Sequence, residues 1–483
     1  MQFTSLDFAL FFGIVLLLNW RLRESPRFYP PTLLVFNLVF YALSAPKFLP
    51  LLLIVGILNW RAATLLGPER SPFFRRLVIS VDVVLNLGIL AFFKYFDFLL
   101  TSLESLGLPL HGGLFSLPEI VYPVGLSFFT FQGLSLAIDR YRDPELKSPA
   151  FLECLIFVSF FPTVLSGPIQ RFGNFLPQLE KAQTGPEDYS LALTLIITGL
   201  FKKVALSSYL SEYAVRGVFQ MPEQYSFLGV LGAVYGYSAQ IYLDFSGYSD
   251  LAQGVGLLLG FNVGVNFASP YLSTNIRDFW RRWHISLSSW LRDYLYIPLG
   301  GSRKGSATLN LIVTQTLGGL WHGAHLRYIL WGLGHGFLLA ATHAVLLARK
   351  RRERALDALN FKSWQRPVKR FTGLKKFFAF LFTFHAVSLL WILFRADTTA
   401  RAWEVFTGLF DFSRRGEGIP LLAWIIVFIT FFGQWAGKEM KELMTLVQSR
   451  MSLPLLSLWC AFWVIIILRL GPDGVLPFIY FQY

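Results

Sequence analysis

The chain has few charged residues and almost no cysteine. Charged side chains make up 15% of the 483 residues, whereas soluble domains carry about 25%, and 54% of the residues are hydrophobic. This composition excludes a soluble globular protein and indicates a polytopic membrane protein. The two cysteines, Cys154 and Cys460, lie in separate apolar runs without ligand spacing, so the sequence indicates neither a disulfide framework nor thiol chemistry.

Several sequence motifs are also missing. The chain has no GxGxxG, Walker, GxSxG or kinase-type motif, which argues against a Rossmann domain and a serine hydrolase. The first apolar run, Phe8–Leu18, has no positive segment before it and no small-residue cleavage site after it. We therefore interpret this run as a retained membrane span rather than a signal peptide.

Acidic residues are fewer than basic ones, and the formal net charge is +14. Most of the excess lies in short loops between apolar segments, which favours positive-inside topology over nucleic-acid binding. The rule predicts that Arg277–Lys304 and Arg349–Lys376 are cytoplasmic. It also predicts that Thr101–Leu117 and Ser207–Glu223 lie outside.

Apolar runs make up nearly half of the chain, although most of them are shorter than a full upright span. A span needs about 20 residues, and by this rule we expect an all-α polytopic membrane protein with about eleven to thirteen membrane segments. The candidate runs are Phe8–Leu18, Pro31–Leu43, Phe48–Leu58, Leu77–Leu100, Tyr122–Ala137, Phe151–Pro168, Leu191–Phe201, Phe227–Phe261, Ala307–Leu320, Tyr328–Leu347, Phe377–Phe394, Ile419–Phe432 and Leu453–Leu468.

Some of these runs contain breaks or polar residues. Pro and Gly near its end predict that Phe151–Pro168 is a re-entrant segment with irregular backbone. Asp244 and Asp250 interrupt the long run Phe227–Phe261, where they either line a hydrated cavity or mark a kink. In Leu77–Leu100, Lys94 is close enough on a helix to pair with Asp97. In Tyr328–Leu347, Gly332 and Gly336 are four residues apart on one helix face, where such small residues let another helix approach closely.

Histidines in membrane segments are candidates for the chemistry. Ala307–Leu320 is too short to cross upright, so His322 should lie within the membrane or at its outer edge. A neutral imidazole there could act as a general base on a hydroxyl or accept an acyl group; the alternative is a histidine that only hydrogen-bonds between helices. A metal site at His322, His325 and His335 is disfavoured because Gly323 weakens the helix and no HExxH motif is present.

Two cytoplasmic stretches are candidates for binding a ligand. Asp278–Gly301, DFWRRWHISLSSWLRDYLYIPLGG, mixes arginines, aspartates and aromatic rings, as expected at a membrane boundary or in a polar cavity. Its histidine, His284, would by itself be an ordinary interfacial residue. In the loop GGSRKGS, Arg303 and Lys304 either hold a phosphate-bearing ligand or are simply positive-inside charges.

Five sequence motifs, taken together and in this order, give a family resemblance. They are Tyr122–Arg142, Phe160–Phe172, Tyr242–Phe261, Asn275–Gly301 and Gly319–Ala324. With these motifs the chain resembles the membrane-bound O-acyltransferase superfamily, and within it the membrane subunits of bacterial alginate O-acetyltransferases, with D-alanyl-lipoteichoic acid acyltransferases as more distant relatives. Similar motifs cover about two-thirds of the chain. One departure is visible, since Thr163 and Ser166 stand where Gln and Ala are expected.

The resemblance implies a fold and a reaction. It implies a ring of tilted and re-entrant helices around a central funnel, in a single domain 1–483 with its motif-bearing core at about 120–347 and peripheral helices in 377–470. It also implies catalysis by His322 and His284 in a bacterial inner membrane, with acetyl groups passing from cytosolic acetyl-CoA toward an exopolysaccharide such as alginate. No bound cofactor, metal or nucleic acid is expected.

The same resemblance suggests partners and further site residues. A separate periplasmic, SGNH-like acetyltransferase would complete transfer to the sugar hydroxyls. Other envelope polymers (cellulose, peptidoglycan, teichoic acid) are alternatives, as is a transporter or channel that uses Asp244, Asp250 and His322. The candidate residues for binding substrate or donor are Asp278, Trp280, Arg281, Arg282, Trp283, Arg303, Lys304 and Trp321.

Overall fold

The computed structural model describes residues 1–106, 121–181, 183–358 and 372–472. This part of the chain is built of helices and turns without a β-strand, apart from an isolated bridge between Tyr225 and Glu417. Its α-helices are α1 (Leu6–Leu22), α2 (Tyr29–Ser44), α3 (Leu49–Leu65), α4 (Pro72–Ser105), α5 (Leu126–Arg142), α6 (Phe151–Ser159), α7 (Phe161–Val164), α8 (Phe172–Glu180), α9 (Tyr189–Leu200), α10 (Ser208–Leu210), α11 (Arg216–Gln220), α12 (Phe227–Leu258), α13 (Ile276–Arg282), α14 (Ile285–Leu291), α15 (Ala307–His322), α16 (Leu326–Ala358), α17 (Thr372–Arg395), α18 (Thr399–Gly408), α19 (Leu421–Ser449) and α20 (Leu453–Leu470).

Several helical stretches are long enough to cross a bilayer. Within the described residues, seven combine sufficient length with an apolar composition, and many of their Leu, Ile and Phe side chains are exposed, as lipid-facing side chains are. The prediction of an all-α polytopic membrane protein is therefore confirmed. The seven stretches are Pro46–Leu65, Pro72–Leu100, Tyr189–Gln220, Leu326–Ala355, Gly373–Arg395, Leu421–Ser449 and Leu453–Leu470.

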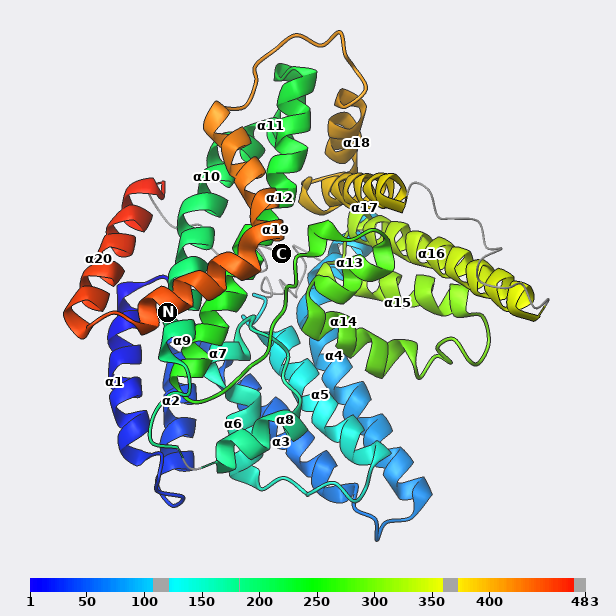
Figure 1. The fold of residues 1–483 in the computed structure, drawn as a ribbon. Coiled ribbons are helices and arrows are strands. Elements are labelled where there is room, and N and C mark those ends of the chain that lie inside the picture. Colours follow the sequence, from blue (N-terminus) through cyan, green and yellow to red (C-terminus); the bar gives the residue numbers. More distant parts are fainter. Residues whose placement is uncertain (107–120, 182, 359–371, 473–483) are drawn as a thin grey trace.

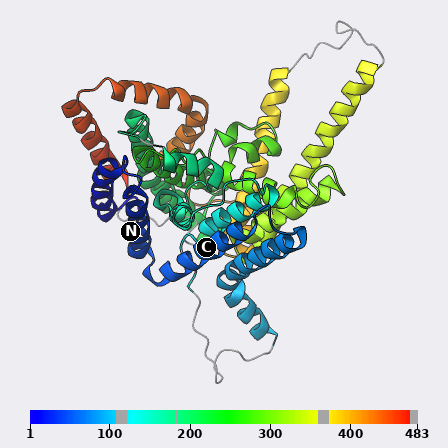
Figure 2. The same cartoon turned by 90° about the horizontal axis from the view of Figure 1, so that it is seen from below.

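The short helices α13 and α14 lie near the middle of the molecule, with longer helices around them (Figure 1). Figure 2 shows that the C-terminal end of α4 projects on the side opposite to the C-terminal end of α16. The end of α16 carries a run of exposed basic residues, 349–352, whereas the end of α4 has no Lys or Arg after Lys94. The ends of α4 and α16 therefore lie on opposite sides, which agrees with the predicted outer position of Thr101–Leu117 and the predicted cytoplasmic position of Arg349–Lys376. Most of the predicted loop Thr101–Leu117 and part of Arg349–Lys376 lie outside the described residues.

The predicted break in Phe151–Pro168 is confirmed. Helix α6 ends at Ser159, and the four-residue helix α7 follows after Phe160. The side chain of Asn37 on α2 accepts a hydrogen bond from the Phe161 backbone N–H, 3.1 Å away, so the break leaves this buried donor satisfied. Gly125 packs against the broken segment with φ +81°, and a Cβ there would lie 2.4 Å from the Val164 carbonyl oxygen. Whether the segment leaves on the side where it enters stays a prediction.

The polar residues within the predicted run Phe227–Phe261 do not break its helix. Helix α12 continues through Asp244 and Asp250. Lys203 Nζ lies 2.6 Å from an Asp244 oxygen, and Lys202 Nζ lies 2.6 Å from an Asp250 oxygen. The helix tolerates two acids because lysines of the facing helix neutralise them.

The loop predicted at Ser207–Glu223 is also wrong, because the chain stays helical to Gln220. Two π-helical stretches, Phe201–Ser207 and Ser211–Val215, join α9, α10 and α11 into one continuous helical segment. Lys202 and Lys203 lie in the first stretch and face α12.

Helices α15 and α16 pack through glycine, as small residues at Gly332 and Gly336 predict. A Cβ at Gly319 would lie 2.2 Å from the Tyr328 carbonyl oxygen, and one at Gly332 would lie 2.4 Å from the Gln315 carbonyl oxygen. At Gly336 it would lie 2.8 Å from the Ile312 Cα. The two backbones therefore touch, which fixes the end of α15 relative to α16.

Candidate active site

Helix α15 carries His322 on its last residue. The helix begins after Ser306, whose side chain accepts a hydrogen bond from the Leu309 backbone N–H, and it ends before Gly323. Its 16 residues span about 24 Å, less than the hydrocarbon core of a bilayer. The predicted short helix that ends at His322 is confirmed.

Aromatic rings surround the buried His322 imidazole. Its centroid lies 4.6 Å from the Trp321 ring, 5.2 Å from the Trp331 ring and 4.8 Å from the Phe394 ring. Trp331 comes from α16 and Phe394 from α17, which belongs to the region 377–470 that the sequence interpretation set outside the motif-bearing core. Three helices thus hold this imidazole in an apolar box that largely excludes water.

His284 lies at the junction of α13 and α14 in a left-handed backbone conformation. Its φ is 41° and its ψ is 58°, a conformation that costs a residue other than glycine about 1–2 kcal/mol. Asn266 holds the junction, because its carbonyl oxygen accepts the Ile285 N–H at 3.0 Å and its side chain accepts the Ser286 N–H at 3.3 Å. The buried His284 ring packs 4.5 Å from Phe245 on α12 and is close enough to act electrostatically on His322.

His335 and several tryptophans of α13, α16 and α17 form a second group of rings near His322. The fully buried His335 ring lies 5.1 Å from Trp280 and 4.7 Å from Trp331, which also contacts His322. Trp283 packs 5.1 Å from Trp391 of α17. The predicted binding residues Trp280, Trp283 and Trp321 therefore lie in the region around His284 and His322. His335 lies in the same region.

The predicted donor-binding cations lie on two separate elements of the chain. Arg281 is exposed, and Arg282 forms an ion pair of 3.1 Å with Asp278 one helical turn earlier. Arg303 and Lys304 are exposed in the turn before α15, whereas His322 is at its far end, about 24 Å away.

The segment after α14 is fixed to α5 and α8 by a polar cluster. Tyr294 donates to Asp139 at 2.8 Å, and the Arg171 guanidinium lies over the Tyr294 ring, 4.4 Å from its centroid. Arg171 also pairs with Asp293 at 3.6 Å. Burial raises the pKa of the Asp139 carboxyl and lowers the pKa of the Arg171 guanidinium. Sequence reasoning missed this cluster because its members are far apart in the chain.

Asp244 and Asp250, the predicted cavity residues, bind lysines. The Asp244 pair is almost fully buried, with 9% of the Asp244 side chain and 4% of the Lys203 side chain exposed. Asp244 is the neighbour of Phe245, which contacts His284. Within the described residues no three His, Cys, Asp or Glu side chains form a group that could hold a metal ion.

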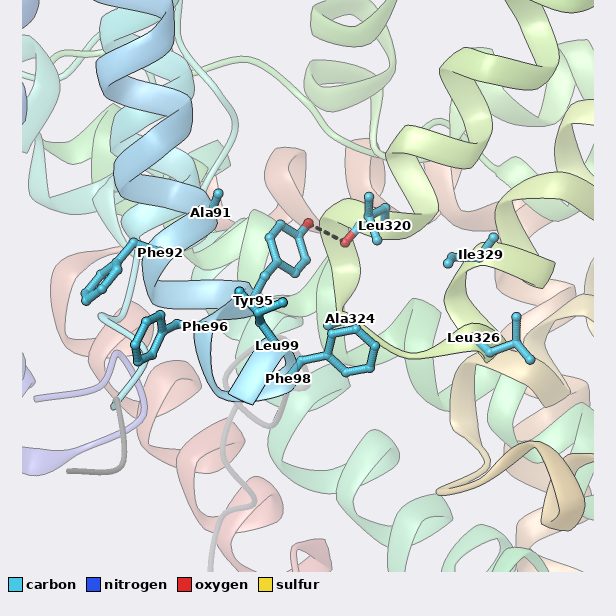
Figure 3. Close-up of a pocket in the computed structure, with 10 residues that line it drawn as sticks. All are labelled: Ala91, Phe92, Tyr95, Phe96, Phe98, Leu99, Leu320, Ala324, Leu326 and Ile329. Atoms are coloured by element: carbon cyan, nitrogen blue, oxygen red, sulfur yellow. Dashed lines mark hydrogen bonds between the residues drawn. The ribbon is translucent and has the colours of Figure 1, made fainter. Parts of the chain in front are cut away.

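Sequence reasoning also missed how α4 approaches the end of α15. The Tyr95 hydroxyl donates to the Leu320 carbonyl oxygen at 2.7 Å (Figure 3). Beside this bond is an apolar pocket of about 580 Å³, lined by residues of α4 and of the α15–α16 turn. The predicted Lys94–Asp97 pair does not form; Lys94 Nζ lies over the rings of Trp321 and Tyr122 instead. The lining residues are Ala91, Phe92, Tyr95, Phe96, Phe98, Leu99, Leu320, Ala324, Leu326 and Ile329.

The fold and the site together define a class of protein. It is a multi-pass helical membrane protein with a buried histidine at the end of a short helix. The profile of the membrane-bound O-acyltransferase family matches residues 126–390, and the chain belongs to this family. It is a membrane-embedded O-acyltransferase.

Relatives in three groups agree with this assignment. The chain is 34% identical over 509 residues to a probable alginate O-acetylase of Pseudomonas putida, covering 100% of this chain and 99% of that one. It is 34% identical over 415 residues to a peptidoglycan O-acetyltransferase of Helicobacter pylori, covering 80% and 74% of the two chains. It is 36% identical over 232 residues to a teichoic acid D-alanyltransferase of Bacillus subtilis, covering 45% and 58%.

Proposed function

We propose that this enzyme moves acetyl groups from cytosolic acetyl-CoA across the bacterial inner membrane for O-acetylation of an exopolysaccharide such as alginate. The relatives that match over most of the chain support the acetyl group and a cell-envelope polymer as the acceptor class. A separate periplasmic, SGNH-like acetyltransferase completes transfer to the sugar hydroxyls in this proposal. Peptidoglycan and teichoic acid are the alternative polymers because relatives that act on them also match.

The observation that carries the proposal is His322 at the end of a helix too short to span the bilayer, inside a box of aromatic rings. In such a site, His322 takes the proton of the acceptor hydroxyl while the hydroxyl oxygen bonds to the thioester carbonyl carbon. The carbon–sulfur bond then breaks, and the thiolate receives the proton from His322. His284, held at a strained backbone position next to the site, keeps that region in place for the donor.

The cations near the predicted cytoplasmic face support an anionic donor. Arg281, Arg282, Arg303 and Lys304 are at least partly exposed, and they would attract the phosphates of a nucleotide-bearing thioester. Because the two pairs occupy different elements, each would meet a different part of a long donor.

The test replaces His322 by glutamine in cells that make the polymer. We expect polymer O-acetylation to fall at least about 100-fold, since one general base contributes about 10²–10⁴ in rate. His343→Gln is the matched control, because His343 lies on the membrane helix α16 and has no role in the proposed site. Retained acetylation in His322→Gln at wild-type protein level would rule out this function for His322.

A further inference from the structure

Lys94 is a cation in the apolar part of α4. Among the described residues no carboxylate lies within ion-pair distance of its ammonium group, including Asp97 one turn away. Its Nζ lies 5.2 Å from the centroid of the Trp321 ring and 5.3 Å from that of the Tyr122 ring. An ionisable residue within a membrane helix is by default a functional candidate.

Lys94 contacts Trp321, the residue that precedes His322 in the chain. The rings of Trp321 and His322 are 4.6 Å apart, so Lys94 contacts the ring next to the His322 imidazole. Lys94 also approaches the C-terminal end of α15, where the helix dipole favours a positive charge. The next residue, Tyr95, fixes α4 to the same turn through its bond to Leu320 (Figure 3).

Stability alone does not explain a cation at this place. A cation–π contact is a modest stabilising interaction, whereas a lysine at the centre of a membrane helix is costly. Two ring contacts and a favourable helix end are of the same order as that cost. An apolar residue of the same length would fill the space without the cost, so the charge itself needs another reason.

We propose that Lys94 is the cation that stabilises the negative charge on the acyl carbonyl oxygen during transfer at His322. This rests on the proposed function. As the acceptor oxygen bonds to the carbonyl carbon and its proton passes to His322, the carbonyl π electrons move onto the oxygen. The Lys94 ammonium faces this oxyanion without giving up a proton. The electrons return as the carbon–sulfur bond breaks, and His322 returns the proton to the thiolate.

An apolar site makes such a group valuable. Oxyanion stabilisation acts strongly where water is excluded, and the rings around His322 exclude it. Other cations of the region, such as Arg281 and Arg303, are on exposed segments nearer the predicted cytoplasmic face. Arg327 is buried in α16, but its guanidinium donates to the Ala396 carbonyl of the loop after α17.

The experiment compares Lys94→Met, Lys94→Gln and Lys94→Arg in the purified full-length enzyme, with acetyl-CoA as the probe, water in place of the acceptor hydroxyl and thiol release as the readout. Loss of one oxyanion-stabilising donor lowers kcat by about 10²–10³. We expect this loss for Met and Gln with KM changed less than about threefold, and more than a tenth of wild-type kcat for Arg. Lys438→Met, at an exposed lysine of α19, is the control and should retain full activity.

Other outcomes overturn the proposal. A kcat for Lys94→Met within about threefold of wild type would do so, as would rescue by the uncharged Gln. Loss of folded protein in both uncharged variants, measured by thermal denaturation in detergent, would assign the charge to the fold instead. If the wild type releases no thiol, or His322→Gln stays fully active, the proposed function fails. An inactive His322→Gln beside an active Lys94→Met would sink the Lys94 role alone.

Discussion

Lys203 and Lys94 both lie in helices of the membrane region, but their charged groups have different neighbours. Lys203 pairs with Asp244 at 2.6 Å in the tight contact between the α9–α11 segment and α12. Lys94 lies instead over the rings of Trp321 and Tyr122 beside His322. A charge that is matched by an acid serves packing between helices, whereas the charge that faces rings at the end of α15 is the one that we propose acts on the substrate. The comparison separates the scaffold from the site by how each charge is satisfied.

The largest expected effect on stability comes from breaking the scaffold pair. Lys203→Met leaves Asp244 buried without its lysine, which should destabilise the protein by about 3–5 kcal/mol. Thermal denaturation in detergent measures the change. The double variant Lys203→Met, Asp244→Leu should recover most of the loss. Lys94→Met should show the reverse pattern, with little loss of stability and a large loss of kcat; a similar profile for the two lysine variants would erase the distinction.

A smaller effect should follow from separating α15 and α16. Gly319→Ala puts a methyl group 2.2 Å from the Tyr328 carbonyl oxygen, so the helices must shift, at a cost of about 1–3 kcal/mol. Because His322 lies one turn further along, kcat should fall as well. Gly13→Ala in α1 is the control, since nothing lies within 4 Å of a Cβ there. An unchanged melting temperature for Gly319→Ala would contradict the close helix contact.

The bond between α4 and α15 should contribute less. Tyr95→Phe removes only the hydroxyl that donates to Leu320, and one such bond contributes about 0.5–1.5 kcal/mol. The matched control is Tyr213→Phe at a half-exposed tyrosine. If thermal denaturation gave equal values for both variants, the Tyr95 bond would have no part in holding the end of α15.

The smallest effect is expected at His335. Both of its ring nitrogens are buried without a hydrogen-bond partner in the described residues, and replacing unpaired polar groups by an apolar ring of similar shape is nearly neutral or stabilising. His335→Phe should therefore change the free energy of unfolding by less than about 1 kcal/mol. A loss above 2 kcal/mol would mean that the imidazole makes a stabilising bond.

Local signals in the sequence predict much of the fold. Run lengths predict the membrane helices, Pro162 and its neighbours predict the break after α6, and the spacing of Gly332 and Gly336 predicts the close packing of α15 on α16. The short run before Trp321 predicts the end of α15 at His322. Each signal depends on residues near one another in the chain, where helix geometry and membrane thickness are sufficient.

Contacts between distant segments could not be predicted in this way. Lys202 and Lys203 satisfy Asp244 and Asp250 from another helix, so the polar run within α12 looked like a break. Phe394 reaches His322 from α17, whose apolar run Phe377–Phe394 has no charged residue or motif to mark it. Lys94 has Asp97 at helical spacing, yet the rings of Trp321 and Tyr122 are its neighbours in space.

Inverted inner-membrane vesicles offer the most direct measurement of the central claim, that an acyl group passes through the membrane at His322. Radiolabelled acetyl-CoA is added outside vesicles that contain the polymer and its periplasmic acetyltransferase in the lumen. Wild-type vesicles should acetylate the enclosed polymer, and vesicles with His322→Gln should fall to the level of vesicles lacking the enzyme. Equal labelling of the polymer in both would contradict the account.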